Sequence, residues 1–97
     1  MDQGNAHKSV IVRIEGRVQG VWYRGWTVDE ATRRNLQGWV RNRADGSVEA
    51  QFAGSKDAVD AMLEACWKGP TAARVSKVTP TPAPPPTEPG FQTLPTQ

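Results

Sequence analysis

The 97-residue chain is long enough for one domain, and its 37% hydrophobic and 23% charged residues indicate a globular protein. Its single cysteine excludes an internal disulfide and a cysteine-cluster metal site, and its single histidine, His7, argues against a catalytic triad and a histidine-ligated metal. No apolar run is long enough for a membrane span. A net charge of +2 does not by itself indicate binding to nucleic acid. We therefore expect a reduced, soluble, cytoplasmic monomer.

The N-terminal part of the chain predicts a strand, a loop and a helix. Residues 1–8 are polar and are expected to form a disordered tail ahead of a domain over residues 9–97. Apolar and polar side chains alternate in residues 9–15, as in a half-buried strand. A glycine-containing connection over residues 16–22 then leads to helical spacing over residues 23–35.

The middle of the chain predicts a hairpin. Asn35 suits the left-handed position that ends the first helix. Residues 36–43 form a second predicted strand and residues 47–53 a third, on which Val48, Ala50 and Phe52 share a face. The Asp-Gly pair at 45–46 is typical of the tight turn between two such strands.

The last part predicts a helix and two further strands. Ser55 is a suitable N-cap for a second helix, which Gly69-Pro70 ends. Residues 72–79 form a weakly patterned fourth strand. Six of the residues from Pro80 to Pro89 are proline, which predicts an extended connection, before a possible short edge strand over residues 90–94.

The resulting order, β-α-β-β-α-β with a possible fifth edge strand, predicts an α+β fold. This order is that of the ferredoxin-like α/β sandwich, in which two helices cover one face of an antiparallel sheet. Many functions occur on this fold, so the function has to be argued from individual residues.

The segment over residues 16–24 carries the most informative chemistry. Gly16 and Gly20, between a strand and a helix, would let backbone N–H groups turn inward to bind phosphate, although an ordinary tight turn has the same spacing. Arg24 lies where the helix dipole disfavours a cation, and Arg17 lies nearby, so either an anion binds between them or both are solvated. The candidate phosphate-binding residues are Gly16, Arg17, Val18, Gln19, Gly20, Val21, Trp22, Tyr23 and Arg24.

Other polar side chains give weaker signals. Asn42 ends the second strand, where its amide either satisfies backbone groups or holds a water or substrate oxygen. Asp29 and Glu30 are adjacent on a helix and therefore point to different faces, which predicts solvated side chains rather than a catalytic pair. Cys66 falls in an apolar stripe and is expected to be a buried thiol. Most of the four tryptophans are expected in the core, with Trp22 partly shielding the loop.

The sequence Gly-Arg-Val-Gln-Gly-Val-Trp-Tyr-Arg at 16–24 resembles the signature loop of the acylphosphatases, G-x-V-x-G-V-x-[FY]-R. Gly-Trp-Val-Arg-Asn at 38–42, followed by Asp-Gly-Ser-Val-Glu at 45–49, resembles that family's second signature. The resemblance extends over residues 9–94, and two long motifs at the right separation make it specific. Shorter matches are Gly69-Pro70, Ala73, Val75, Val78 and Gly90-Phe91.

This resemblance implies hydrolysis of small acyl phosphates to a carboxylate and inorganic phosphate. It implies that Arg24 and the loop amides bind the phosphoryl group and that Asn42 orients the attacking water. Neither a metal, nor a cofactor, nor a covalent enzyme intermediate is implied. Inorganic phosphate or sulfate is expected as a product-like ligand, and neither nucleic acid nor a membrane is expected as a partner.

Two alternative functions are weighed against this one, and the first, an RNA-recognition domain, has the same predicted order of elements. An RNA-recognition domain needs stacking aromatics on its central strands, and the third predicted strand has only Phe52, in line with its apolar face. The other alternative is a small-ligand regulatory domain or part of a larger carbamoyl-phosphate-handling enzyme. Phosphoryl transfer depends on positioning and charge stabilisation, which suits a chain with so few acid–base side chains.

Overall fold

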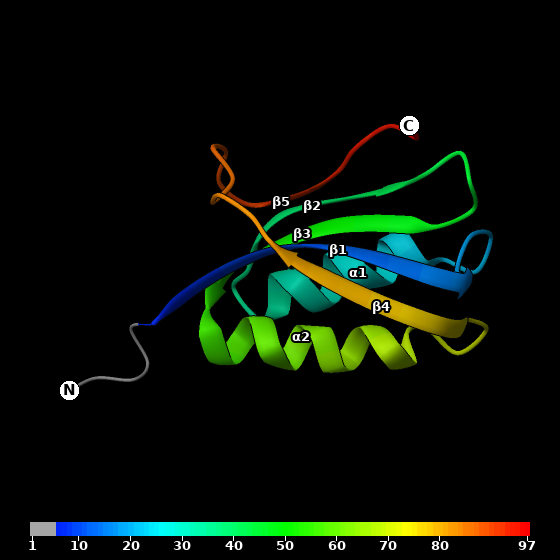
Figure 1. The fold of residues 1–97 in the computed structure, drawn as a ribbon, viewed down its shortest axis with the longest axis horizontal. Coiled ribbons are helices and arrows are strands. Elements are labelled where there is room, and N and C mark those ends of the chain that lie inside the picture. Colours follow the sequence, from blue (N-terminus) through cyan, green and yellow to red (C-terminus); the bar gives the residue numbers. More distant parts are fainter. Residues whose placement is uncertain (1–5) are drawn as a thin grey trace.

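Two helices cover one face of a five-stranded sheet in the computed structural model, which describes residues 6–97 (Figure 1). This arrangement confirms the predicted α+β order, including the short fifth strand. No helix within residues 6–97 combines the length and the apolar character needed to cross a membrane. The elements are β1 (His7–Arg17), α1 (Tyr23–Arg33), β2 (Gln37–Asn42), β3 (Val48–Ser55), α2 (Lys56–Lys68), β4 (Arg74–Pro82) and β5 (Phe91–Thr93).

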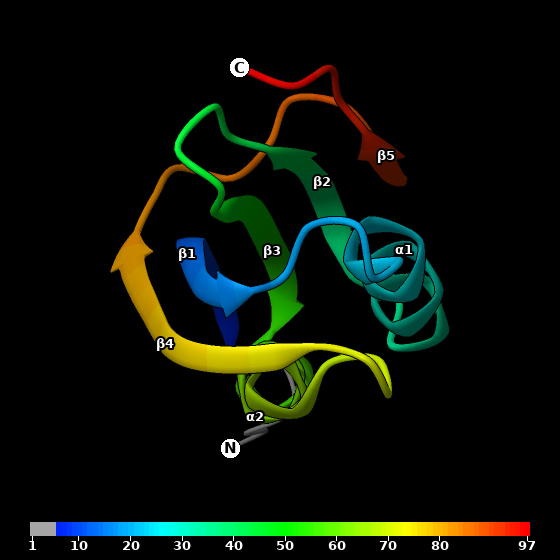
Figure 2. The same ribbon diagram turned by 90° about the vertical axis from the view of Figure 1, so that its right-hand side faces the viewer.

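The sheet has the order β4-β1-β3-β2-β5, in which only the β2–β5 pair is parallel (Figure 2). Alternate side chains of the strands point toward the helices and form the core with the apolar stripe of α2. The β1–α1 loop and the β2–β3 hairpin lie at the same end of the molecule (Figure 1). Fully buried side chains of this core include Val12, Ile14, Val40, Val48, Phe52, Val59 and Met62.

Strand β1 is longer than predicted at both ends. His7 pairs with Ser55 of β3, so the strand begins two residues earlier than the predicted start of the domain. At its other end, Gly16 and Arg17 pair with β4 after an irregularity next to Glu15. Pairing partners far along the chain therefore extend the strand, and residues 1–5 of the predicted tail lie outside the described residues.

The predicted boundary between the fourth strand and the proline segment is wrong. Strand β4 runs on through Pro80 to Pro82, because it is an edge strand and a proline there need not supply a ladder N–H. The segment after Pro82 crosses the open face of the sheet to reach β5 (Figure 2). The side-chain amide of Gln51, a buried residue of β3, donates a 2.6 Å hydrogen bond to the carbonyl oxygen of Pro84 and anchors this crossing.

The expectation that most tryptophans lie in the core is also wrong. Trp22 and Trp67 are 64% and 52% exposed, and Trp26 and Trp39 are only partly buried. The core instead takes Tyr23 as its largest side chain. A small, closely packed core with Tyr23 and Phe52 already in it leaves little room for several indoles.

Candidate active site

A cavity of about 270 Å3 lies where the β1–α1 loop meets the ends of β2 and β5. It brings together residues from the two signature segments and from the end of the sheet. Among residues 6–97, Arg24 is the one charged residue that lines this cavity, and none of the lining residues has a carboxylate. The cavity therefore favours an anion. Its lining residues are Val18, Gln19, Gly20, Trp22, Tyr23, Arg24, Gly25, Asn42 and Thr93.

The loop backbone has the form expected of an anion-binding nest. Gly20 and Trp22 have φ angles of +75° and +66°, while Val21 between them has a negative φ. Such alternation turns successive N–H groups toward one side. Helix α1 starts directly after Trp22, with no side chain capping its N-terminus and no acidic residue in its first turn. The first N–H groups of the helix and the positive end of its dipole thus face the same region.

Arg24 is the second residue of α1. A cation at this end of a helix is unfavourable by about 0.3–1 kcal/mol, and within residues 6–97 Arg24 has no ion-pair partner that would offset this. A bound anion would offset it, since a planar guanidinium can donate two parallel hydrogen bonds to a phosphoryl group.

Asn42 is the last residue of β2 and reaches the cavity from the sheet. Its side-chain carbonyl oxygen is buried and has no hydrogen-bond partner among residues 6–97. A buried acceptor left unpaired costs about 1–3 kcal/mol. This oxygen is therefore suited to accept a hydrogen bond from a water or substrate group that enters the cavity.

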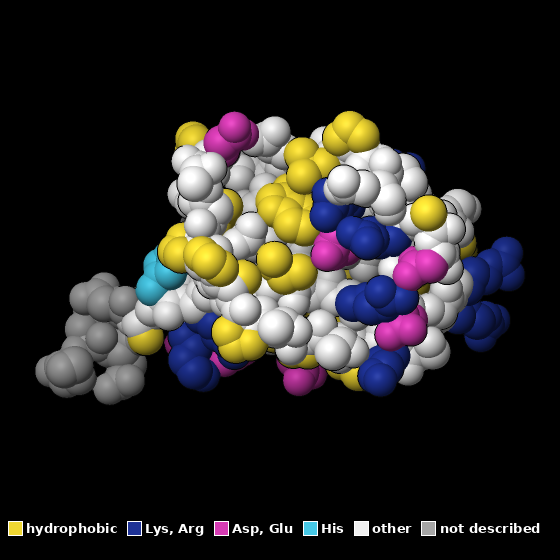
Figure 3. Space-filling model, turned by 45° about the horizontal axis from the view of Figure 1, so that its top comes forward, with side chains coloured by type: hydrophobic (Ala, Val, Ile, Leu, Met, Phe, Trp, Pro, Cys, Tyr) yellow, Lys and Arg dark blue, Asp and Glu magenta, His cyan; other side chains and the backbone are white. Residues whose placement is uncertain are grey.

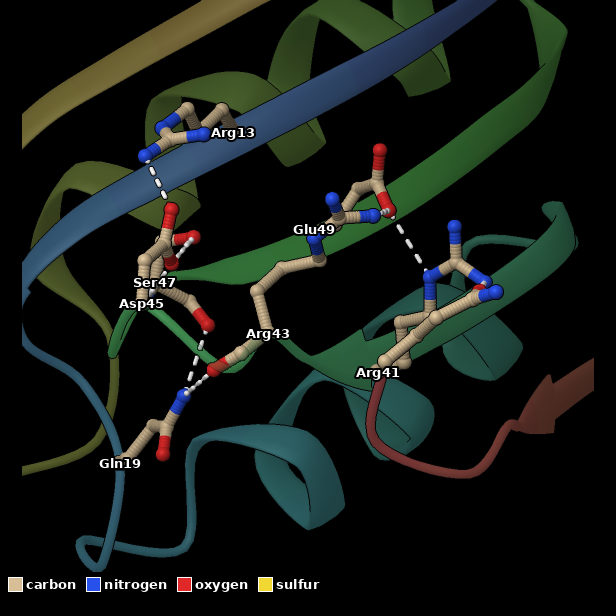
Figure 4. A network of polar contacts seen from close by, with 8 residues as sticks. Arg13, Gln19, Arg41, Arg43, Asp45, Ser47 and Glu49 are labelled. Carbon is tan, nitrogen blue, oxygen red and sulfur yellow. Dashed lines mark hydrogen bonds and ion pairs between the residues drawn. The ribbon is translucent and has the colours of Figure 1, made fainter.

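Gln19 links the loop to the β2–β3 hairpin (Figure 4). Its side-chain amide donates hydrogen bonds of 2.8 Å and 2.9 Å to the carbonyl oxygens of Arg43 and Ser47. Because Arg43 directly follows Asn42, these bonds couple the loop that leads into α1 and Arg24 to the strand that carries Asn42. The sequence indicated Gln19 only as a member of the loop.

Three arginines on or beside the β2–β3 hairpin, unlike Arg24, are paired with acidic neighbours. Figure 3 shows Lys and Arg side chains alternating with Asp and Glu over this part of the surface. Arg41 and Arg43 share the carboxylate of Glu49, and Arg13 pairs with Asp45 (Figure 4). Hydrogen bonds from Ser47, followed by the Arg13 guanidinium, lower the pKa of Asp45 to about 2. These pairs hold the hairpin and contrast with the unpaired Arg24.

Tyr23 anchors the start of α1 in the core. Its side chain is buried, and its hydroxyl donates a 2.6 Å hydrogen bond to the carbonyl oxygen of Cys66 near the end of α2. Burial, with the neighbouring Cys66 thiol, raises the pKa of Tyr23 well above its ordinary value. Burial likewise raises the pKa of Cys66 to about 12, which makes this thiol a poor nucleophile and confirms its predicted buried position.

The structure brings most of the predicted site residues to the cavity but not all of them. Gly16 and Arg17 are paired with β4 and do not line it. Val21 packs against the core beside it. The sequence did not indicate Gly25, which follows directly after Arg24, or Thr93. The parallel pairing of β5 with β2 places Thr93 opposite Val40, two residues before Asn42, and so brings it to the cavity. Gly25 could have been inferred from its place in the first helical turn, whereas Thr93 has no local signal.

A second cavity, of about 390 Å3, lies on the open face of the sheet beneath the proline crossing. Its lining includes Trp39 and Glu88, and it has no cation to bind a phosphoryl group. The Glu88 carboxylate accepts a hydrogen bond from Gln92, whose side chain also lines this cavity. A carboxylate at this position disfavours an anion, so the smaller cavity at Arg24 is the better candidate active site despite its size.

Comparison with known proteins identifies relatives of the chain. The family model Acylphosphatase matches residues 10–93. An acylphosphatase of Rhodospirillum rubrum is 58% identical over 88 residues, which is 91% of this chain and 97% of that protein. A solved structure of an acylphosphatase from Coxiella burnetii superposes with a TM-score of 0.88 at 30% identity and covers 97% of this chain and all of the other. One from Bacillus subtilis superposes with a TM-score of 0.84 at 32% identity, over 89% of this chain and 97% of the other.

Proposed function

The chain belongs to the acylphosphatase family, enzymes that hydrolyse acyl phosphates, and on this basis we propose how Arg24, the loop amides and Asn42 divide the reaction. Arg24 and the N–H groups of residues 18–25 bind the phosphoryl group of a small acyl phosphate. Asn42 orients the attacking water. The observation that carries this proposal is that Arg24, unpaired among residues 6–97, and the buried, unpartnered oxygen of Asn42 line one cavity.

Charge stabilisation is the main contribution of the protein. The transition state of phosphoryl transfer spreads negative charge over three phosphoryl oxygens. The guanidinium of Arg24 and the uncapped N–H groups of α1 are donors that are already in position before the substrate binds. They need little reorganisation as the charge develops.

Asn42 acts on the nucleophile. One water hydrogen donates to its side-chain carbonyl oxygen, which holds the water oxygen toward phosphorus. The water oxygen bonds to phosphorus while the bond from phosphorus to the acyl oxygen breaks, and the acyl group leaves as a carboxylate. Both water protons remain on the released phosphate, with one first accepted by a phosphoryl oxygen of the substrate. A carboxylate is a good leaving group, so the reaction needs no general acid and no covalent enzyme intermediate.

The test is release of inorganic phosphate from benzoyl phosphate in the presence of EDTA. Arg24→Ala and Asn42→Ala are each expected to lower the rate by about 10²–10³, the usual effect of removing one pre-positioned stabilising group. Arg74→Ala is the matched control, because Arg74 is an exposed arginine on β4 that does not line the cavity. Inorganic phosphate should inhibit the wild type, and Arg24→Ala should weaken that inhibition. Full activity in both cavity variants would refute the assignment.

A further inference from the structure

Trp22 is the most exposed large apolar side chain among residues 6–97, and it lies at the cavity. Its indole is 64% exposed although apolar surface is ordinarily withdrawn from water. Its backbone has φ +66° and ψ +25°, a left-handed conformation that is a genuine outlier for a bulky side chain. Strained residues of this kind persist where the surrounding structure holds them, and they cluster at ligand sites.

The indole is held over the first turn of α1. A Cβ atom at Gly25 would lie 2.3 Å from the Nε1 atom of Trp22, so only a glycine leaves room for the ring there. Trp22, Arg24 and Gly25 all line the same cavity. The apolar surface of the ring and the phosphoryl-binding guanidinium therefore belong to one site, within three residues of each other.

An acyl phosphate has two parts that need different surroundings. If the phosphoryl group binds at Arg24 and the loop amides, the acyl group has to extend toward the mouth of the cavity. Val18 and Tyr23 also line the cavity, but their side chains are buried in the core. Trp22 is thus the large apolar side chain left exposed to contact the acyl group.

We propose that Trp22 is a specificity-determining residue that binds the acyl group and favours flat, apolar acyl groups over small or polar ones. The inference rests on the proposed function and extends it to the class of substrate. An aromatic acyl group can stack on the indole, which adds about 0.5–1.5 kcal/mol to area burial for a pair of aromatic groups. This energy corresponds to about 2–10-fold in kcat/KM.

The experiment compares kcat/KM for benzoyl phosphate and for acetyl phosphate. The ratio of the two is expected to fall about 2–10-fold in Trp22→Ala and to be largely kept in Trp22→Phe. Trp67→Ala is the matched control, because Trp67 is a comparably exposed tryptophan on α2 that does not line the cavity, and its ratio should equal that of the wild type. Gly25→Ala should lower the ratio too, because the new methyl group displaces the indole without removing it.

Each outcome decides the proposal. If the ratio in Trp22→Ala equals that of the wild type while both rates fall together, Trp22 acts only through the shape of the loop and the specificity role is refuted. If the wild type hydrolyses neither substrate, the proposed function fails and the inference fails with it. Circular dichroism and a thermal melt of each variant distinguish a loss of specificity from a loss of folded protein.

Discussion

The side-chain amide nitrogen of Gln19 lies 2.8 Å from the carbonyl oxygen of Arg43, the residue that follows Asn42. A second bond from the same amide reaches the carbonyl oxygen of Ser47. The two halves of the candidate active site, the loop and the end of β2, are therefore joined by one uncharged side chain across 24 positions of sequence.

Gln19→Ala is expected to lower both stability and activity. Loss of two hydrogen bonds should reduce the free energy of unfolding by about 1–3 kcal/mol. A small displacement of the loop relative to Asn42 should lower kcat/KM by about 10–100-fold, because misplacing a reacting group by 1 Å can lower the rate by about 10²-fold. Urea denaturation and phosphate release measure the two effects. Gln92→Ala is the control, because it removes one exposed hydrogen bond from Gln92 to Glu88. An equal effect in this variant would contradict the positioning role of Gln19.

Gly38→Ala is expected to destabilise the sheet strongly. The residue has φ +141°, and a Cβ atom there would lie 1.8 Å from the carbonyl oxygen of Gln51 on β3. Backbone strain of about 1–3 kcal/mol and overpacking of about 1–3 kcal/mol should together lower the free energy of unfolding by about 2–6 kcal/mol. Gly90→Ala is the control, because Gly90 also has a positive φ but open space around its Cβ position, so only about 1–2 kcal/mol is expected. Chemical denaturation measures the free energy of unfolding of both variants. An equal loss in Gly38→Ala and Gly90→Ala would show that the close contact between Gly38 and Gln51 does not matter for stability.

Tyr23 should remain un-ionised at alkaline pH for as long as the protein stays folded. Its pKa is raised in the folded state and is near 10 in the unfolded chain, so its contribution to stability is fully present below pH 10 and is lost as pH rises above it. Because it is the single tyrosine, its absorbance at alkaline pH reports this residue alone. Phenolate absorbance should appear together with loss of the far-ultraviolet circular dichroism signal. A titration near pH 10 in folded protein would show that the hydroxyl is accessible.

Asp45 should make the stability of the hairpin depend on acidic pH. Its pKa is lowered from an ordinary value of 3.8 to about 2 by Ser47 and Arg13. The stabilisation is therefore fully present above about pH 4 and is lost as pH falls toward 2. Asp45→Asn keeps an oxygen that can accept from Ser47 but removes the charge. The difference in unfolding free energy between wild type and Asp45→Asn should shrink between pH 5 and pH 2, and a constant difference over that range would contradict the pairing.

Local chemistry in the sequence was sufficient to predict several element ends. Ser55 accepts the N–H of Ala58 as the N-cap of α2, and Asn35 has φ +59° after α1, both as predicted. Such signals work because cap and turn residues act through atoms only a few positions away. The tight turn at Asp45-Gly46 has the same origin.

Contacts between distant segments could not be predicted in this way. The amide of Gln51 bonds to Pro84 across 33 positions, and this bond depends on a register that only the assembled sheet defines. Thr93 reaches the cavity for the same reason, through the pairing of β5 with β2. The role of Gln19 could not be predicted because its partners are backbone carbonyl oxygens, which every residue has whatever its side chain. The two signature segments indicated which residues meet, but not the bonds that hold them.

The proline content of β4 bears on how the protein behaves in concentrated solution. An edge strand with free N–H and C=O groups can recruit a strand from another molecule and start aggregation. Lys77, Pro80 and Pro82 lie along this edge, so it combines a charge with two positions that have no N–H to donate. The opposite edge, β5, spans only Phe91–Thr93. Both margins of the sheet therefore discourage intermolecular strand pairing, which protects a small domain whose strands are rich in valine.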